Sequence, residues 1–146
     1  MRVELCDGRI IVQAKADLVL GRAQGTEARV LIIDFKTGTR YATHVDDLRF
    51  YALLETIRSG VPPFRVASYY LDSATFHSED VDLDVLEVAI SRTVAGVTKV
   101  AELHLLDREP IITPGPTCRF CLLRSDCEGA RRWELTRAEP EVDGLT

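Results

Sequence analysis

The feature that most constrains the fold is an uninterrupted apolar run, Val30-Leu31-Ile32-Ile33, which ends in Asp34-Phe35-Lys36-Thr37. A short run of branched apolar residues predicts a buried β-strand. Side chains alternate between the two faces of a strand, so Asp34 and Lys36 point to one side and Phe35 to the other. A carboxylate and an ammonium group at the end of a buried strand can hold a hard divalent cation and orient a water molecule beside it.

A second carboxylate, Asp17, precedes this strand in similar surroundings. The alternating stretch 10–20 predicts another strand, with Asp17 as the last charged group on its polar face. The segment 21–29 between the two strands contains Gly21 and Gly25 and is typical of a hairpin loop. A hairpin would place Asp17 and Asp34 on neighbouring strands, close enough to share one metal ion.

Together these residues resemble the PD-(D/E)xK nuclease superfamily, and specifically its RecB-like branch. The resemblance rests on Asp17, on Asp34-Phe35-Lys36-Thr37-Gly38, and on Tyr51, which occupies the Tyr position of a Gln-x-x-x-Tyr motif in the next helix. Asp47 stands in the Gln position, which removes an amide donor and adds a negative charge. The resemblance implies an α/β fold with a mixed central β-sheet flanked by helices, a restriction-endonuclease-like core that here lacks its first helix.

The implied activity is that of a metal-dependent DNA exonuclease domain in a DNA repair or processing nuclease. The resemblance implies that Asp17, Asp34 and Lys36 are catalytic. Asp17, Asp34 and the backbone carbonyl of Phe35 would bind Mg²⁺ or Mn²⁺. Lys36 would orient the water or stabilise developing charge.

Tyr51 and Asp47 would position DNA beside this site. DNA is the implied substrate, and a helicase or another nuclease subunit is the implied partner. Three alternatives stay open. In the first, the chain is a catalytically inactive nuclease-like module for DNA or protein binding or assembly, which Asp47 and the missing first helix favour. In the second, Asp34 and Lys36 are only a solvated ion pair at a strand end. In the third, the chain is a zinc-knuckle interaction domain that carries an incidental strand motif.

Three cysteines near the C-terminus, Cys118, Cys121 and Cys127, predict a metal centre, because a two-residue gap lets both thiolates reach one ion. The resemblance implies a [4Fe-4S] cluster; Zn²⁺ and inert buried thiols are the alternatives. The remaining cysteine, Cys6, lies on the first predicted strand and is the weaker candidate for a fourth ligand. With three ligands in reach, we expect the cluster to be absent or labile and the segment after Pro114 to be poorly ordered.

The chain of 146 residues is predicted to be one nuclease core at 1–112, N-terminally incomplete, followed by a cysteine-bearing metal or cluster segment at 113–135 and a flexible tail at 136–146. We expect strands at about 2–6, 10–20, 29–36 and 65–72, helices at about 45–59 and 82–106, and an irregular cysteine segment. The second helix carries an apolar stripe, which predicts that it lies across the sheet. The stripe comprises Leu83, Leu86, Ile90, Val94, Val97 and Ala101.

Composition limits the remaining classes. The net charge of −5 argues mildly against a broad phosphate-binding surface. The three histidines (His44, His77 and His104) have no metal-ligand spacing and are expected at the surface or the core edge. No stretch is long enough to span a membrane and the N-terminus does not resemble a signal peptide, so we expect a cytoplasmic protein with no membrane partner.

Overall fold

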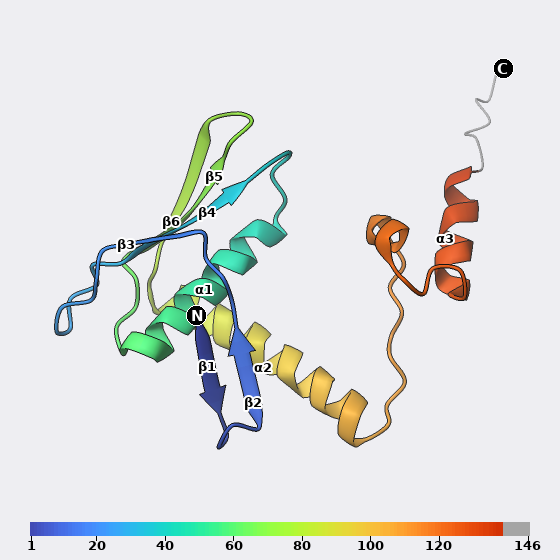
Figure 1. The fold of residues 1–146 in the computed structure, drawn as a ribbon, viewed down its shortest axis with the longest axis horizontal. Helices are drawn as coiled ribbons and strands as arrows, with labels where there is room; N and C mark the ends of the chain where they lie inside the picture. The colour runs from blue at the N-terminus through green and yellow to red at the C-terminus, as the bar shows by residue number, and fades with distance from the viewer. Residues whose placement is uncertain (139–146) are drawn as a thin grey trace. The chain divides into compact units, whose positions relative to one another are not determined.

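Two small β-sheets and two long helices make up the first part of the chain. The computed structural model describes residues 1–138. It divides into two compact units, Met1–Glu102 and Leu103–Thr146, and each is described by itself. In the first unit, β1 (Arg2–Leu5) and β2 (Ile10–Gln13) form an antiparallel hairpin, and a separate sheet has the order β3-β4-β5-β6 (Figure 1). Its strands are β3 (Leu18–Leu20), β4 (Leu31–Lys36), β5 (Arg65–Tyr70) and β6 (Thr75–Asp80).

The four-stranded sheet is mixed. The central strands β4 and β5 are parallel, and each edge strand is antiparallel to its inner neighbour. Parallel neighbours need a crossover connection, which α1 (Thr43–Ser59) supplies between β4 and β5. The mixed α/β fold predicted from the sequence is therefore confirmed.

The core lies between this sheet and α1. Ile32 of β4 and Val66 of β5 are neighbours in the ladder and are fully buried against Leu48 and Ala52 of α1. Leu86, in the first turn of α2 (Leu83–Leu105), joins the same cluster. Because side chains alternate along β4, the face that buries Ile32 also carries Asp34 and Lys36. The packing of α1 thus covers the charged end of the strand.

One predicted strand is wrong in its extent. The stretch 10–20 is not a single strand but two, β2 and β3, in different sheets. The chain leaves the hairpin at Ala14, whose N–H donates to Met1 O at 2.9 Å, and Ala16 then packs against the core cluster. The alternating pattern continues through this crossing, so periodicity alone does not reveal the change of partner.

Two further differences concern β6 and α2. The strand β6 was not predicted, because most of its residues are exposed and it is held by its backbone ladder with β5. In α2 only Val85, Leu86 and Ala89 are buried. The apolar stripe is therefore not laid across the sheet, since Ile90 and Val94, one and two turns further on, are exposed.

The second unit contains the cysteine segment. It forms a short 3₁₀-helix, η1 (Pro116–Phe120), and a final helix, α3 (Glu128–Ala138), rather than the irregular segment expected. Gly129 at the start of α3 lies so close to Ile112 and Pro114 that a Cβ there would come within 3.1 Å of both side chains. Of the predicted tail, residues 139–146 lie outside the described residues. No helix of residues 1–138 is long and apolar enough to cross a bilayer.

Candidate active site

The centre of the site is the carboxyl end of β4. Asp34 is only 5% exposed, and its Oδ2 lies 2.6 Å from the Nζ of Lys36. The same ammonium group donates a hydrogen bond of 3.3 Å to Oδ2 of Asp47 on α1. Lys36 therefore bridges a buried carboxylate on the sheet and an exposed carboxylate on the helix.

Asp17 approaches this pair from the neighbouring strand. The antiparallel register places Leu18 opposite Ile33, and Asp17 is the residue immediately before Leu18. The backbone N–H of Phe35 donates to Oδ2 of Asp17 at 2.8 Å. The predicted hairpin between β3 and β4 thus brings the two carboxylates of the sequence motif together, although Asp17 lies just before β3 rather than within it.

Asp34 differs from Glu55, the other buried carboxylate within residues 1–138. Glu55 on α1 is also buried, but its oxygens accept three hydrogen bonds from Arg58. The Lys36 ammonium group balances the charge of Asp34 as an ion pair, and Oδ2 of Asp34 accepts no hydrogen bond in the described part of the chain. A carboxylate has several lone pairs, so this oxygen can still bind a ligand beside Lys36.

Electrostatics tie Lys36 and Tyr51 to the same site. Burial lowers the pKa of Lys36, but the adjacent carboxylates of Asp34 and Asp47 raise it more, so its pKa is raised above the ordinary 10.5. The pKa of Tyr51 is raised above 10.0, chiefly by burial and then by the charges of Asp34, Asp47 and Asp17, with Lys36 opposing. At neutral pH Lys36 is therefore a cation and Tyr51 a neutral phenol.

The donor set suits a hard cation. The carboxylates of Asp17 and Asp34 are oxygen ligands of the type that Mg²⁺ and Mn²⁺ prefer, and Oδ2 of Asp34 has unused lone pairs. Within residues 1–138, no three side chains of His, Cys, Asp or Glu converge as metal ligands, so a cation here would need backbone or substrate oxygens as well. The role of the Phe35 carbonyl as such a ligand stays a prediction.

The predicted cysteine centre is not assembled. Sγ of Cys118 accepts the N–H of Gly115 at 3.3 Å, and Sγ of Cys127 accepts the N–H of Ala130 at 3.4 Å. Cys121 is exposed. Within residues 1–138 no three potential metal ligands lie close together, and this holds for the three cysteines, so their predicted convergence is not seen.

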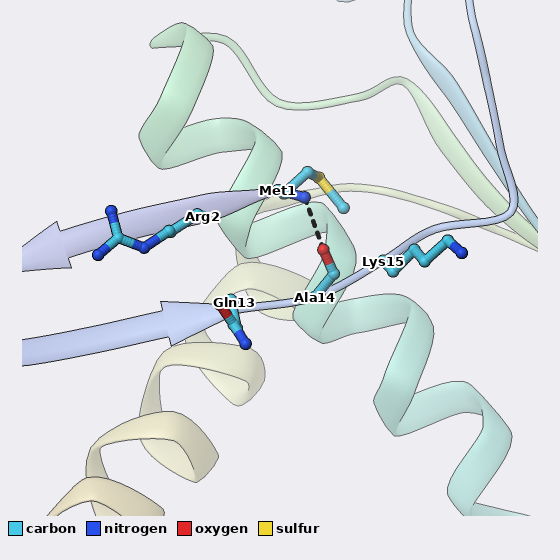
Figure 2. Close-up of a pocket in the computed structure, with 5 residues that line it drawn as sticks. All are labelled: Met1, Arg2, Gln13, Ala14 and Lys15. Carbon is cyan, nitrogen blue, oxygen red and sulfur yellow. Dashed lines mark hydrogen bonds between the residues drawn. The ribbon is translucent and has the colours of Figure 1, made fainter.

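A separate hollow of about 560 Å³ lies at the open end of the β1–β2 hairpin (Figure 2). Met1, Arg2, Gln13, Ala14 and Lys15 line it, and the Met1 amino group donates to Ala14 O at 2.6 Å. None of the residues of the candidate active site lines this hollow, and it has no part in the chemistry.

The structure adds a pair of residues that the sequence did not indicate. His44, expected at the surface or the core edge, is half-buried, and its Nδ1 lies 2.8 Å from the hydroxyl of Tyr70, which is the ladder partner of Lys36. A signal was present in the helix spacing, because His44, Asp47 and Tyr51 recur at i, i+3 and i+7 and share one face of α1.

The fold and the site define a class. A mixed sheet that carries two carboxylates and a lysine at the end of a central strand is suited to metal-assisted hydrolysis. A family model described as the PD-(D/E)XK nuclease superfamily matches residues 1–128, so the chain belongs to that superfamily. Its members are usually nucleases that use Mg²⁺ or Mn²⁺, which gives the chain a nuclease-type function and DNA as its substrate class. No curated protein matches the chain.

Proposed function

We propose that this chain is the metal-dependent DNA exonuclease domain of a RecB-like repair or processing nuclease. The observation that carries the proposal is the buried carboxylate of Asp34, whose Oδ2 is paired with the ammonium group of Lys36 and accepts no hydrogen bond within residues 1–138. Asp17, just before β3, lies beside the same end of β4, because its Oδ2 accepts the N–H of Phe35. Tyr51, at the Tyr position of the RecB-like motif, supports the branch because its phenol is in the same electrostatic environment. A cytoplasmic location is part of the same proposal.

The roles of the residues follow from their positions. Asp17 and Asp34 would hold Mg²⁺ or Mn²⁺, with the Phe35 carbonyl as a third ligand. A divalent cation in that place polarises the scissile phosphate and activates water. If Asp34 binds a divalent cation, Lys36 still donates its hydrogen bond to Asp47. The ammonium group of Lys36 can then stabilise the charge that develops on the phosphate.

Metal binding is the direct test of this assignment. Titration of the chain with Mn²⁺ in a calorimeter is expected to show binding that Asp17→Ala weakens by about 10-fold or more, the range found when a group that supports a metal is removed. Asp7→Ala, on the turn of the β1–β2 hairpin, is a matched control that should bind as the native chain does. Equal binding by the native chain and Asp17→Ala would show that the cation, if bound, lies elsewhere.

The alternative function is a catalytically inactive nuclease-like module for DNA or protein binding or assembly. It is favoured by the ion pairs of Lys36, which satisfy its charge with Asp34 and Asp47 without any cation. In such a module the three side chains only stabilise the end of β4. The same titration separates the two functions, since the inactive module binds no Mn²⁺ at Asp17 and Asp34.

We also propose that the cysteine segment binds a metal centre, a [4Fe-4S] cluster with Zn²⁺ as the alternative. Two observations support it. The spacing of Cys118, Cys121 and Cys127 suits thiolate ligation. Backbone N–H groups already point at the sulfur atoms of Cys118 and Cys127, and such hydrogen bonds stabilise thiolates.

The metal of the cysteines has a simple readout. After anaerobic reconstitution with iron and sulfide, or addition of Zn²⁺, the chain is expected to take up metal that a chelator removes quickly, because only three thiolate ligands are in reach. Cys121→Ser should lose most of this metal, because Cys121 would supply one of the three thiolate ligands. Cys6→Ser is the matched control and should retain it. Equal metal content in all three proteins would contradict the proposal.

A helicase or another nuclease subunit is the proposed partner. The face of the sheet opposite α1 supports a partner, because Leu20, Phe35 and Phe76 are exposed there. Apolar groups that gather on one exposed face are typical of interaction surfaces.

A further inference from the structure

Four aromatic side chains touch one another beside the candidate active site. Tyr41 lies edge-on to His44, with ring centroids 5.4 Å apart, and His44 stacks on Tyr70 at 5.8 Å. Tyr70 meets His77 edge-on, also at 5.8 Å. We refer to Tyr41, His44, Tyr70 and His77 as the aromatic cluster. Its rings come from the segment before α1, from α1 itself and from the strands β5 and β6.

The aromatic cluster adjoins the catalytic motif on two sides. Tyr70 is the ladder partner of Lys36 in the parallel pair β4–β5, so their side chains are neighbours on one face of the sheet. His44 lies one turn before Asp47, which is hydrogen-bonded to Lys36. The cluster therefore lies at the carboxyl ends of two parallel strands, the edge at which open α/β sheets bind their ligands.

The cluster is fixed at one end and open at the other. Tyr70 is 3% exposed and its hydroxyl is hydrogen-bonded to Nδ1 of His44 at 2.8 Å, which holds both rings. Tyr41, at the outer end, is 61% exposed. An exposed aromatic ring whose position is fixed by contact with buried neighbouring rings is suited to stacking on a planar ligand.

The charges near the site favour stacking over phosphate contacts. Phosphate neutralisation supplies much of the affinity of most DNA-binding proteins, but this chain has a net charge of −5. Lys36, the cation at the centre of the site, already faces Asp34 and Asp47. Stacking of bases on aromatic rings needs no positive charge, and it needs bases that are not paired in a duplex.

We propose that the aromatic cluster binds an unpaired nucleobase of a single-stranded DNA end through the exposed ring of Tyr41, and so leads the strand to Lys36 and Asp34. The proposal rests on the proposed function for its ligand, DNA, and adds the form of that DNA, a single-stranded end. Tyr41 acts as a binding residue that sets this preference, and His44 and Tyr70 support it.

Binding can be measured without cleavage. Fluorescence anisotropy of the full chain in EDTA would compare three labelled ligands: a duplex with a single-stranded tail, the same duplex with an abasic tail, and a blunt duplex. The abasic tail keeps every phosphate and removes only the bases. The native chain is expected to bind the tail with bases most tightly. Equal affinity for the base-bearing and abasic tails would overturn the proposal.

Variants of Tyr41 then locate the effect. Tyr41→Ala is expected to weaken binding of the base-bearing tail by about 5- to 150-fold, the range for loss of one stacked base. It should leave binding of the abasic tail unchanged, and Tyr41→Phe, which keeps a ring, should retain most of the affinity. Phe64→Ala is the matched control, because Phe64 is 43% exposed but directly precedes β5, at the opposite end of that strand from Tyr70. Equal losses in Tyr41→Ala and Phe64→Ala would overturn the proposal.

Failure of this inference is distinguishable from failure of the proposed function. Cleavage of the same ligands in Mg²⁺ by the native chain and by Asp34→Asn tests the nuclease site alone. Cleavage that depends on Asp34, together with binding that is indifferent to Tyr41, would refute the stacking site and leave the nuclease assignment standing. Binding that depends on Tyr41, without any cleavage, would support the stacking site and count against catalysis.

Discussion

Replacing Asp34 by Asn is expected to lower DNA cleavage by about 10²- to 10³-fold, the loss that follows removal of one preorganised electrostatic group. Asn keeps the shape of the side chain but loses the negative charge that would attract a divalent cation. The substitution also removes the ion pair between Asp34 and Lys36, while Lys36 keeps its hydrogen bond to Asp47. The measurement is the initial rate of release of nucleotides from a labelled DNA end in Mg²⁺, with thermal unfolding to show that the fold is intact.

Asp80→Asn is the matched control for this experiment. It makes the same chemical change on the same sheet, but Asp80 lies on the outer face of β6, where it pairs with Arg65. Loss of such an exposed pair has little effect on stability, because solvent screens it, and should not affect cleavage. Lys36→Ala is expected to lower cleavage in the same range as Asp34→Asn. Full activity in Asp34→Asn would mean that the catalytic site has been assigned to the wrong residues.

Replacing Gly21 by Ala is expected to destabilise the protein by about 2–5 kcal/mol. Gly21 follows β3 with a φ of +84°, and an added Cβ would lie 2.1 Å from the carbonyl oxygen of Arg29, just before β4. Positive φ costs a residue with a Cβ about 1–2 kcal/mol, and forcing an atom into filled space costs about 1–3 kcal/mol more. Chemical denaturation monitored by circular dichroism gives the free energy of unfolding.

Gly25, in the same loop, separates the two causes. Its φ is +60°, but nothing lies within 4 Å of an added Cβ, so Gly25→Ala should lower the free energy of unfolding only by the cost of the positive φ. The clash at Gly21 would also push β3 from β4, and the bond from the Phe35 N–H to Asp17 depends on that pairing. Gly21→Ala should therefore weaken Mn²⁺ binding as well. Equal stability of the two variants would show that the loop yields to the added atom at little cost.

The identity of β4 and the side on which its charged residues lie were predictable from local chemistry. An apolar run of branched residues forms a buried strand, and alternation then puts Asp34 and Lys36 on one face. The glycine-containing segment 21–29 predicted the hairpin that brings Asp17 to Asp34. The first helix was also predictable, with its beginning at Thr43 only two residues from the expected position.

Other features depended on contacts between distant segments. The alternation from Ile10 to Leu20 did not show that the chain passes from one sheet to another, because a side-chain pattern indicates a buried face and not the strand that pairs with it. The strand β6 is mostly exposed, so it had little apolar pattern to reveal it. The apolar stripe on α2 predicted that the whole helix packs on the sheet, but its buried residues all lie in the first turns.

The sequence by itself determined the chemical groups of the candidate site, two carboxylates and a lysine on adjacent strands. Only the tertiary structure decided how those groups are satisfied. It pairs the buried Asp34 with Lys36 and shares that ammonium group with Asp47 on α1. It also joins His44 to Tyr70, residues far apart in the chain. The physical reason is that strand and helix periods are local properties, whereas burial and hydrogen-bond partners are set by which elements pack together.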